Sequence, residues 1–267
     1  MQCIHGSKRP CSYLEGCNLL QAHFVAANLR SPDPEFLERN TLRYGRFQLY
    51  RMGMIANGLY AAAPQCDPCN ACVPLRINSA KFEPSKSQMR LITERRKRFA
   101  VYVESTERDG RTNHAHYALH TRYLQARHPE SGMRQASEQD FYRNANGLTH
   151  RLCIHDTENN NRLVGLATFD VLRNEACFHY LSYDPDYMSF SLGKYGWLSL
   201  IDHCMNEGIK HMYVGSWVDG SPKLDYKKNF GGLETFDGDK WVDFDPDRHR
   251  QGPLFDKFVD RKTYQVG

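Results

Sequence analysis

The sequence has no run of about 18 apolar residues, the length that a membrane-spanning helix requires. Its first residues, MQCIHGSKRPCSYLEG, also lack the uninterrupted apolar stretch of a secretory signal peptide. We find neither an internal repeat nor a low-complexity linker in the 267 residues. These absences predict a soluble protein, which we expect in the cytoplasm and without a membrane partner.

A disulfide framework is also missing. The nine cysteines are an odd number scattered along the chain, unlike the dense pattern of small secreted domains. We therefore expect reduced thiols, some of them clustered for a metal. Cys153, Cys177 and Cys204 lie in apolar segments, where a buried structural thiol is expected rather than a nucleophile.

Positive charge is concentrated in one half of the chain. Residues 1–150 carry 21 Lys and Arg against 13 Asp and Glu, whereas residues 151–267 carry 14 against 18. The segment KFEPSKSQMRLITERRKRF, residues 81–99, has seven basic side chains and two glutamates. Such a segment can bind a polyphosphate backbone, although a solvated helix face would have the same composition.

Hydrophobic periodicity and turn residues predict an α/β fold. A hairpin, a helix, a strand, a helix and a strand follow one another after residue 148, which is typical of a mixed sheet with helices on its faces. The strands are expected at 47–52, 73–77, 99–105, 150–156, 162–172, 176–184, 211–217 and in a closing hairpin at 233–244. The helices are expected at 31–45, 85–99, 113–133, 137–145, 192–205 and 221–231.

Six blocks of sequence resemble one family in their order. They are CSYLEG, CNACVPLRI, FEPSKSQMR, YLQARHPESGM, SLGKYGWLSLID and VGSWVDGSPKLDYKKNFGGLE. The chain is similar to the aminoacyl-tRNA–protein transferases, above all to the bacterial aspartate/glutamate leucyltransferase type, which is related to the arginyl-tRNA–protein transferases. The resemblance spans roughly residues 10 to 242.

This resemblance implies a core similar to the N-acetyltransferase (GNAT) acyltransferases. We expect a cysteine-rich basic region in residues 1–99, the GNAT-like core in 100–245 and a tail in 246–267. The implied reaction transfers an aminoacyl group from charged tRNA to a protein that begins with Asp or Glu. Leucine is the expected amino acid. Aminoacyl-tRNA is then the co-substrate, and the product is delivered to the degradation machinery of the N-end rule.

An aminoacyl ester is already activated, so the protein has to position the amine, assist proton loss and stabilise the oxyanion. The helix expected to start at Ser191, Leu192 and Gly193 leaves backbone N–H groups free for the acyl donor, or is simply a capped helix. The family match favours the donor role for these three residues.

A second group of candidates follows the strand 211–217. Trp217 ends that strand, and Lys223, Tyr226 and Lys227 are expected on one basic edge of the helix that follows it. We expect Tyr226 or Asp219 to move the amine proton. Lys223 is expected to face the tRNA terminus or the acceptor carboxylate, although a helix with an exposed basic side would look the same.

The CxxCxxC motif predicts a metal site. Cys66, Cys69 and Cys72 supply three thiols and Cys11 is the candidate fourth, for an iron-sulfur cluster or zinc. Reduced thiols in one pocket, or a labile disulfide, remain the alternative. Arg76 follows the motif on a strand. Its guanidinium can hold the acidic end of the acceptor with two hydrogen bonds, or it can form an internal salt bridge.

The chain departs from the family pattern at Ser216, Asp225, Gly231 and Gly232. These departures leave the donor open between leucyl- and arginyl-tRNA. Two readings from other classes also remain: a tRNA-binding protein without transfer activity, and a metal or redox sensor based on the cysteines.

Overall fold

A computed structural model of the chain describes residues 2–5, 9–11, 13–14, 18–19, 21–25, 34–57, 60–64, 66, 69–105, 114–130, 135–141 and 149–253. The chain divides into two compact units, one formed by residues 1–82 with 213–267 and the other by residues 83–212. The first and last parts of the sequence therefore fold together. The domain boundaries expected after residues 99 and 245 stay a prediction, and the end of the expected tail, from residue 254, lies outside the described residues.

The first unit contains an antiparallel sheet, a short ribbon and the strands that carry most of the candidate residues. The sheet has the order β1-β4-β6-β5, β2 pairs with β3, and β14, β13, β7 and β12 are neighbours in that order. The elements are β1(Gln2–His5), β2(Arg9–Pro10), β3(Asn18–Leu19), β4(Gln21–Val25), α1(Pro34–Arg51), β5(Ile55–Asn57), β6(Tyr60–Pro64), β7(Val73–Asn78), η1(Ser79–Lys81), β12(His211–Trp217), η4(Asp225–Asn229), β13(Leu233–Phe236) and β14(Trp241–Asp243).

Helix α1 extends to Arg51, so the strand expected at residues 47–52 is wrong. The aromatic residues that favoured a strand lie on one buried side of the helix, because residues three apart share a helix face. The rings of Phe47 and Tyr50 are 5.4 Å apart, and both lie within 6.3 Å of the ring of Tyr213. Packing of these rings outweighs their intrinsic preference for a strand.

Antiparallel pairing of β7 with β13 places Glu234 directly opposite Arg76. The turn before β13 depends on Gly232, whose φ is +65°. A Cβ atom at this position would lie 2.8 Å from both the Asn78 carbonyl oxygen and the Phe82 nitrogen. A side chain at position 232 is therefore excluded by backbone conformation and by space, which gives a physical reason for one departure from the family pattern.

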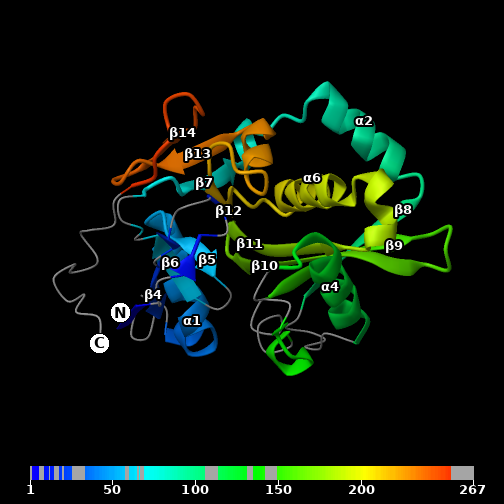
Figure 1. Cartoon of the computed structure of the whole chain (residues 1–267), viewed down its shortest axis with the longest axis horizontal. Helices are drawn as coiled ribbons and strands as arrows, with labels where there is room; N and C mark the ends of the chain where they lie inside the picture. The colour runs from blue at the N-terminus through cyan, green and yellow to red at the C-terminus, as the bar shows by residue number, and fades with distance from the viewer. Residues whose placement is uncertain are drawn as a thin grey trace. The chain divides into compact units, whose positions relative to one another are not determined.

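The second unit is a four-stranded antiparallel segment with helices on both faces. In Figure 1, α6 and α4 lie on opposite sides of β10 and β11. The strands are neighbours in the order β11-β10-β9-β8. The elements are α2(Lys86–Arg95), β8(Phe99–Ser105), α4(His114–Arg127), β9(His150–Asp156), β10(Arg162–Leu172), β11(Glu175–Tyr183), η3(Pro185–Phe190) and α6(Leu192–Asn206).

The local signals at two helix ends are confirmed. Ser85 caps α2 by accepting a hydrogen bond from the Gln88 nitrogen, and the Gln88 side chain accepts one from the Ser85 nitrogen, which is a complete capping box. Helix α6 ends before Gly208, whose φ is +69°.

The helix expected at residues 221–231 is wrong. This segment has only the short 3-10 helix η4, which no side chain caps. The Asp225 carboxylate, which could have capped a helix, accepts a hydrogen bond from the Trp217 indole nitrogen at 3.1 Å and pairs with Lys228 at 2.8 Å. Contacts of one carboxylate with residues eight and three positions away thus replace the helix that the sequence favoured.

The expected α/β class, with helices on the faces of a mixed sheet, is confirmed. No helix in the described part of the chain is both long and apolar enough to cross a membrane.

Asp156 stabilises the second unit from within. It is fully buried, and its carboxylate accepts hydrogen bonds from Arg98 Nε at 3.0 Å, Arg98 Nη2 at 2.7 Å and the Tyr187 hydroxyl at 2.9 Å. The hydrogen bonds from Arg98 hold the pKa of Asp156 down at about 2, although burial opposes this. Since the folded-state pKa is below the usual value, this ion pair stabilises the fold above about pH 4 and its contribution is lost as the pH falls to about 2.

We expect Asp156→Asn to destabilise the second unit by about 3 kcal/mol at neutral pH, because it leaves Arg98 without its buried partner. The pH dependence between about 4 and about 2 should also become shallower in the variant. Native-state hydrogen exchange of the β9 amides measures both effects. Asp202→Asn, which removes an exposed partner of Arg96, is the control and should cost less than about 1 kcal/mol. Equal losses in the two variants would contradict this account.

Candidate functional site

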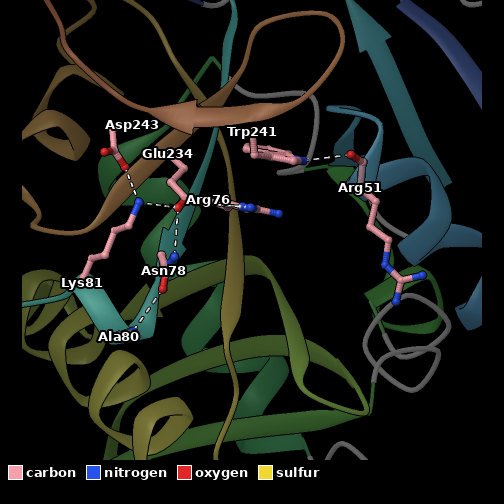
Figure 2. Close-up of polar contacts among 8 residues, drawn as sticks. All are labelled: Arg51, Arg76, Asn78, Ala80, Lys81, Glu234, Trp241 and Asp243. Atoms are coloured by element: carbon pink, nitrogen blue, oxygen red, sulfur yellow. Dashed lines mark hydrogen bonds and ion pairs between the residues drawn. The ribbon is translucent and has the colours of Figure 1, made fainter.

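The buried carboxylate of Glu234 is the centre of a polar cluster in the first unit (Figure 2). Its Oε2 accepts a hydrogen bond from Arg76 Nε at 2.8 Å and forms an ion pair with Arg76 Nη2 at 2.7 Å. Its Oε1 accepts from Asn78 Nδ2 at 2.9 Å and from Lys81 Nζ at 3.0 Å. Lys81 also pairs with Asp243 on the neighbouring strand. Strand β7, the η1 turn and the closing hairpin are therefore joined through one side chain.

Electrostatics keep Glu234 ionised. Burial by itself would raise the pKa of Glu234, but the hydrogen bonds from Asn78, Lys81 and Arg76 outweigh it and lower the pKa to about 2. A buried carboxylate with two cations and an amide on its two oxygens has its charge compensated, and it fixes the position of each partner.

Arg76 is the residue of this cluster that can still bind a ligand. Glu234 contacts Nε and Nη2 of the guanidinium, one side of the fork, and Nη1 has no partner among the described residues. The Trp241 ring lies against the guanidinium at 4.6 Å, and the Trp241 indole nitrogen donates to the Arg51 carbonyl oxygen at 2.8 Å. The internal salt bridge, which the sequence left as an alternative for Arg76, is therefore present. Because Glu234 contacts the side of the guanidinium formed by Nε and Nη2, the end formed by Nη1 and Nη2 still has N–H groups that can bind a second carboxylate.

A cavity of about 280 Å³ lies beside this cluster in the same unit. Lys81, Lys228 and Asp243 line it together with Phe230, Leu233 and Phe244. Both lysines are already paired with carboxylates, Lys81 with Glu234 and Asp243 and Lys228 with Asp225, so the polar part of the wall is charge-compensated.

Lys227 is buried, whereas the sequence placed it on an exposed basic edge. Its Nζ donates to the carbonyl oxygens of Val214 at 2.7 Å and Ser216 at 2.8 Å, both on β12. Burial lowers the pKa of Lys227 to about 7, against an opposing effect of the Cys72 charge. The difference arises because η4 is not an α-helix, so Lys227 does not share a face with Lys223.

The three candidates for proton transfer and substrate contact are all exposed. Lys223 precedes η4, and Tyr226 within it is 42% exposed, with its ring 6.4 Å from that of Phe230. Asp219 lies 3.9 Å from Arg250. All three are accessible to a large substrate.

Trp217 is fully buried, so its ring packs rather than lining a cleft. It contacts the ring of Phe244 at 5.2 Å between centroids, edge to face. Its indole nitrogen holds Asp225, as described above. Trp217 therefore fixes the segment that carries the exposed candidates.

The four predicted cysteines lie near one another. All are half-buried and none forms a disulfide. Burial, followed by the charges of Cys66, Cys11 and Cys69, raises the pKa of Cys72 to about 12, while Lys227 acts in the opposite direction. No three of these four sulfurs lie within 4.8 Å of one another. In the described part of the chain, a different group of three metal-ligating side chains does have that spacing.

The residues predicted to hold the acyl donor belong to the second unit. Ser191 adopts a left-handed conformation, with φ 54° and ψ 39°, at the start of α6, and no side chain caps this helix end. Leu192 is buried, and a Cβ at Gly193 would lie 3.3 Å from the Tyr183 ring. A non-glycine residue with positive φ costs about 1 kcal/mol or more and is common at functional sites.

Acidic partners neutralise part of the basic segment 81–99. Arg90 pairs with Glu94, Arg96 with Asp202 and Arg98 with Asp156. Lys86 and Lys97 have no such partner among the described residues. The free positive charge is thus smaller than the sequence count indicates.

Sequence reasoning missed Glu234, Trp241, Asn78 and Lys81 as members of a site. Glu234 and Trp241 were assigned only to the closing hairpin, more than 150 residues from β7. An ionisable residue in the middle of an apolar strand, as in LETF, was the one available signal.

Two family models match the chain. The N-terminal model of arginine-tRNA-protein transferase matches residues 9–90, and the C-terminal model matches residues 115–237.

Curated relatives agree with these models. An aspartate/glutamate leucyltransferase of Stenotrophomonas maltophilia is 33% identical over 73% of this chain and 78% of the relative. One of Saccharophagus degradans is 29% identical over 88% of this chain and 93% of the relative.

Solved structures show more distant similarity. The C-terminal domain of a lysylphosphatidylglycerol synthetase from Agrobacterium fabrum, itself assigned provisionally, has a TM-score of 0.46 at 11% identity, over 80% of this chain and 72% of that one. A tandem GNAT protein from the clavulanic acid biosynthesis pathway has a TM-score of 0.40 at 10% identity, over 84% and 65%. Scores at this level carry no conclusion. The family models and the curated relatives together cover most of the sequence, and the chain belongs to the arginine-tRNA-protein transferase family.

Proposed function

We propose that this protein transfers leucine from leucyl-tRNA to the α-amine of proteins that begin with Asp or Glu. Membership of the family makes it an aminoacyltransferase, and the observation that carries the proposal is the match of both family models, at residues 9–90 and 115–237. The curated relatives, which are named leucyltransferases, support leucine over arginine as the donor. We place the activity in the cytoplasm, with the degradation machinery acting on the product.

The reaction needs no nucleophilic side chain. The ester of aminoacyl-tRNA is attacked directly by the acceptor amine, so positioning and charge stabilisation supply most of the rate. The buried thiols agree with this scheme, since burial raises the pKa of Cys153 and of Cys204 to about 12 and keeps them protonated.

Arg76 reads the acidic side chain of the acceptor. Glu234 and Trp241 hold its guanidinium on one side, so the free edge is already oriented before the substrate arrives. Preorganisation of this kind lowers the entropy lost on binding. Because its side chain is 14% exposed, Arg76 is partly desolvated, which strengthens a charged hydrogen bond.

Ser191, Leu192 and Gly193 receive the acyl donor at the start of α6. The uncapped helix end offers backbone N–H groups, which favour a developing negative charge. Lys86 and Lys97 belong to the surface that attracts the tRNA backbone.

Proton transfer is assigned to the exposed segment that follows β12. Tyr226 or Asp219 assists loss of the amine proton, and Lys223 faces the tRNA terminus or the acceptor carboxylate. Trp217 and Lys227 are buried and position these residues. Trp217 fixes the segment through its hydrogen bond to Asp225, and Lys227 fixes the end of β12 through its hydrogen bond to the Ser216 carbonyl oxygen.

The cysteines form the third part of the proposal. Cys11, Cys66, Cys69 and Cys72 are four free thiols in one region, a donor set that fits an iron-sulfur cluster or zinc. A bound metal would stabilise the thiolates and tie the cysteine loop to the N-terminal segment. The buried Lys227 would partly balance the negative charge of such a site.

The transfer assay tests the central proposal. We expect the purified protein, supplied with leucyl-tRNA, to add one leucine to peptides beginning with Asp or Glu and none to a peptide beginning with Ala. Mass spectrometry of the peptides detects the product, and arginyl-tRNA should give none. Addition of arginine would contradict leucine as the donated amino acid. Binding of charged tRNA without any product would contradict the proposal that this protein catalyses the transfer.

Arg76→Lys keeps the charge but loses the planar fork. Because charged hydrogen bonds contribute about 1.5–3 kcal/mol, we expect kcat/KM for Asp peptides to fall about 10- to 100-fold, mainly through KM for the peptide. Arg248→Lys, at an exposed pair with Asp245, is the matched control and should change little. An Arg76→Lys variant that melts like the parent and keeps its kcat/KM would remove Arg76 from acceptor recognition.

For the cysteines, we expect protein prepared without oxygen to contain metal, measured by elemental analysis, with visible absorption if the metal is an iron-sulfur cluster. Cys72→Ser should lose this metal, since replacing one ligand of four opens the site. Cys177→Ser, which alters a buried thiol on β11, is the control and should retain it. Metal-free protein, or equal metal content in both variants, would make the four cysteines structural.

A further inference from the structure

A second group of metal-ligating side chains lies in the second unit. Ligand atoms of Glu104, His116 and Cys153 all lie within 4.8 Å of one another. The Cys153 sulfur and the His116 Nε2 are 3.9 Å apart. His116 and Cys153 are buried, whereas Glu104 is exposed. In the described part of the chain this is the one group of three or more such side chains with that spacing.

The fold explains why three residues so far apart in sequence meet. Strands β8 and β9 pair antiparallel with Tyr102 opposite Cys153, so Glu104, two residues further along β8, projects from the same face. Helix α4 covers this face, because Leu119 packs against Cys153 in one apolar cluster. His116 precedes Leu119 by three residues and therefore lies on the same side of the helix.

The chemistry of the group suits zinc. Thiolate, imidazole and carboxylate are the three ligand types that zinc accepts in proteins, and three protein ligands leave a fourth position for water. Zn–S bonds of about 2.3 Å and Zn–N bonds of about 2.0 Å at a tetrahedral angle place sulfur and nitrogen about 3.5 Å apart. The observed 3.9 Å is close to that separation, so small side-chain movements suffice.

One neighbour opposes a cation. Arg151 on β9 lies directly opposite Glu104 on β8 in the strand register. The positive charge of Arg151 lowers the pKa of Cys153, against the larger effect of burial. Without a metal, the Glu104 carboxylate offsets the charge of Arg151. A bound divalent ion takes up the negative charges of both the Cys153 thiolate and the Glu104 carboxylate, so Arg151 loses this compensation. The direct bonds of the ion to two anionic ligands outweigh this cost and the repulsion between the ion and the guanidinium.

We propose that Glu104, His116 and Cys153 bind a zinc ion at a site distinct from the four N-terminal cysteines. The ion would join β8, α4 and β9. Glu104 is the exposed member of the group. It also lines a cavity of about 460 Å³, together with His150, His203 and Glu207. This site is independent of the proposed transfer chemistry.

The test separates this site from the cysteine cluster by replacing Cys11, Cys66, Cys69 and Cys72 with serine in the full-length protein. We expect this variant to bind one equivalent of zinc after dialysis, measured by elemental analysis. Cobalt in place of zinc should give a thiolate-to-cobalt charge-transfer band, which identifies a sulfur ligand. If the fourfold variant does not fold, the same comparison is made in the unaltered chain, where Cys153→Ala should remove one equivalent.

Single substitutions then assign the ligands. Cys153→Ala should abolish the charge-transfer band, and Glu104→Gln should weaken zinc binding at least about 10-fold, since loss of a carboxylate removes a charged ligand. Cys177→Ala, another buried strand thiol, and Glu207→Gln, which lines the same cavity, should bind like the parent. Absence of zinc and of the band, or equal binding by Cys153→Ala and Cys177→Ala, would overturn the proposal.

Discussion

The buried carboxylate of Glu234 is the interaction on which the candidate site in the first unit depends. A charge removed from water is costly unless hydrogen bonds and opposite charges replace the lost solvation. Arg76, Asn78 and Lys81 supply that replacement, and all three come from one short segment after the cysteine loop. The same pairing aligns β7 with the closing hairpin, so Arg76 cannot turn away from its position without removing the partner of Glu234 Oε2.

The same constraint recurs wherever this protein buries a charge. Lys227 donates to two carbonyl oxygens of β12, and Asp156 is held by Arg98 and Tyr187. Such pairs specify geometry more than they add stability. They also change what the basic segment offers to a nucleic acid, because an arginine committed to an internal carboxylate cannot also bind a phosphate.

Local signals predicted much of the fold. The capping box at Ser85, the end of α6 before Gly208 and the strands of the second unit all follow from propensities and periodicity within a short window. Two elements were wrong, at residues 47–52 and 221–231. In the first, Phe47 and Tyr50 pack on Tyr213, which is far away in the sequence, and no local pattern shows this contact. In the second, Asp225 accepts a hydrogen bond from Trp217, eight residues earlier, and does not cap a helix.

The sequence by itself determined the family, the α/β class, the clustering of the cysteines and the presence of Arg76 at the end of their motif, because these depend on order and spacing along the chain. Only the tertiary structure decided which charges are free. Arg76 has one open edge, Lys227 is buried beneath β12, and Glu104, His116 and Cys153 meet across a sheet and a helix. Burial and pairing between distant residues set the charge, exposure and direction of a side chain, and no local pattern contains that information.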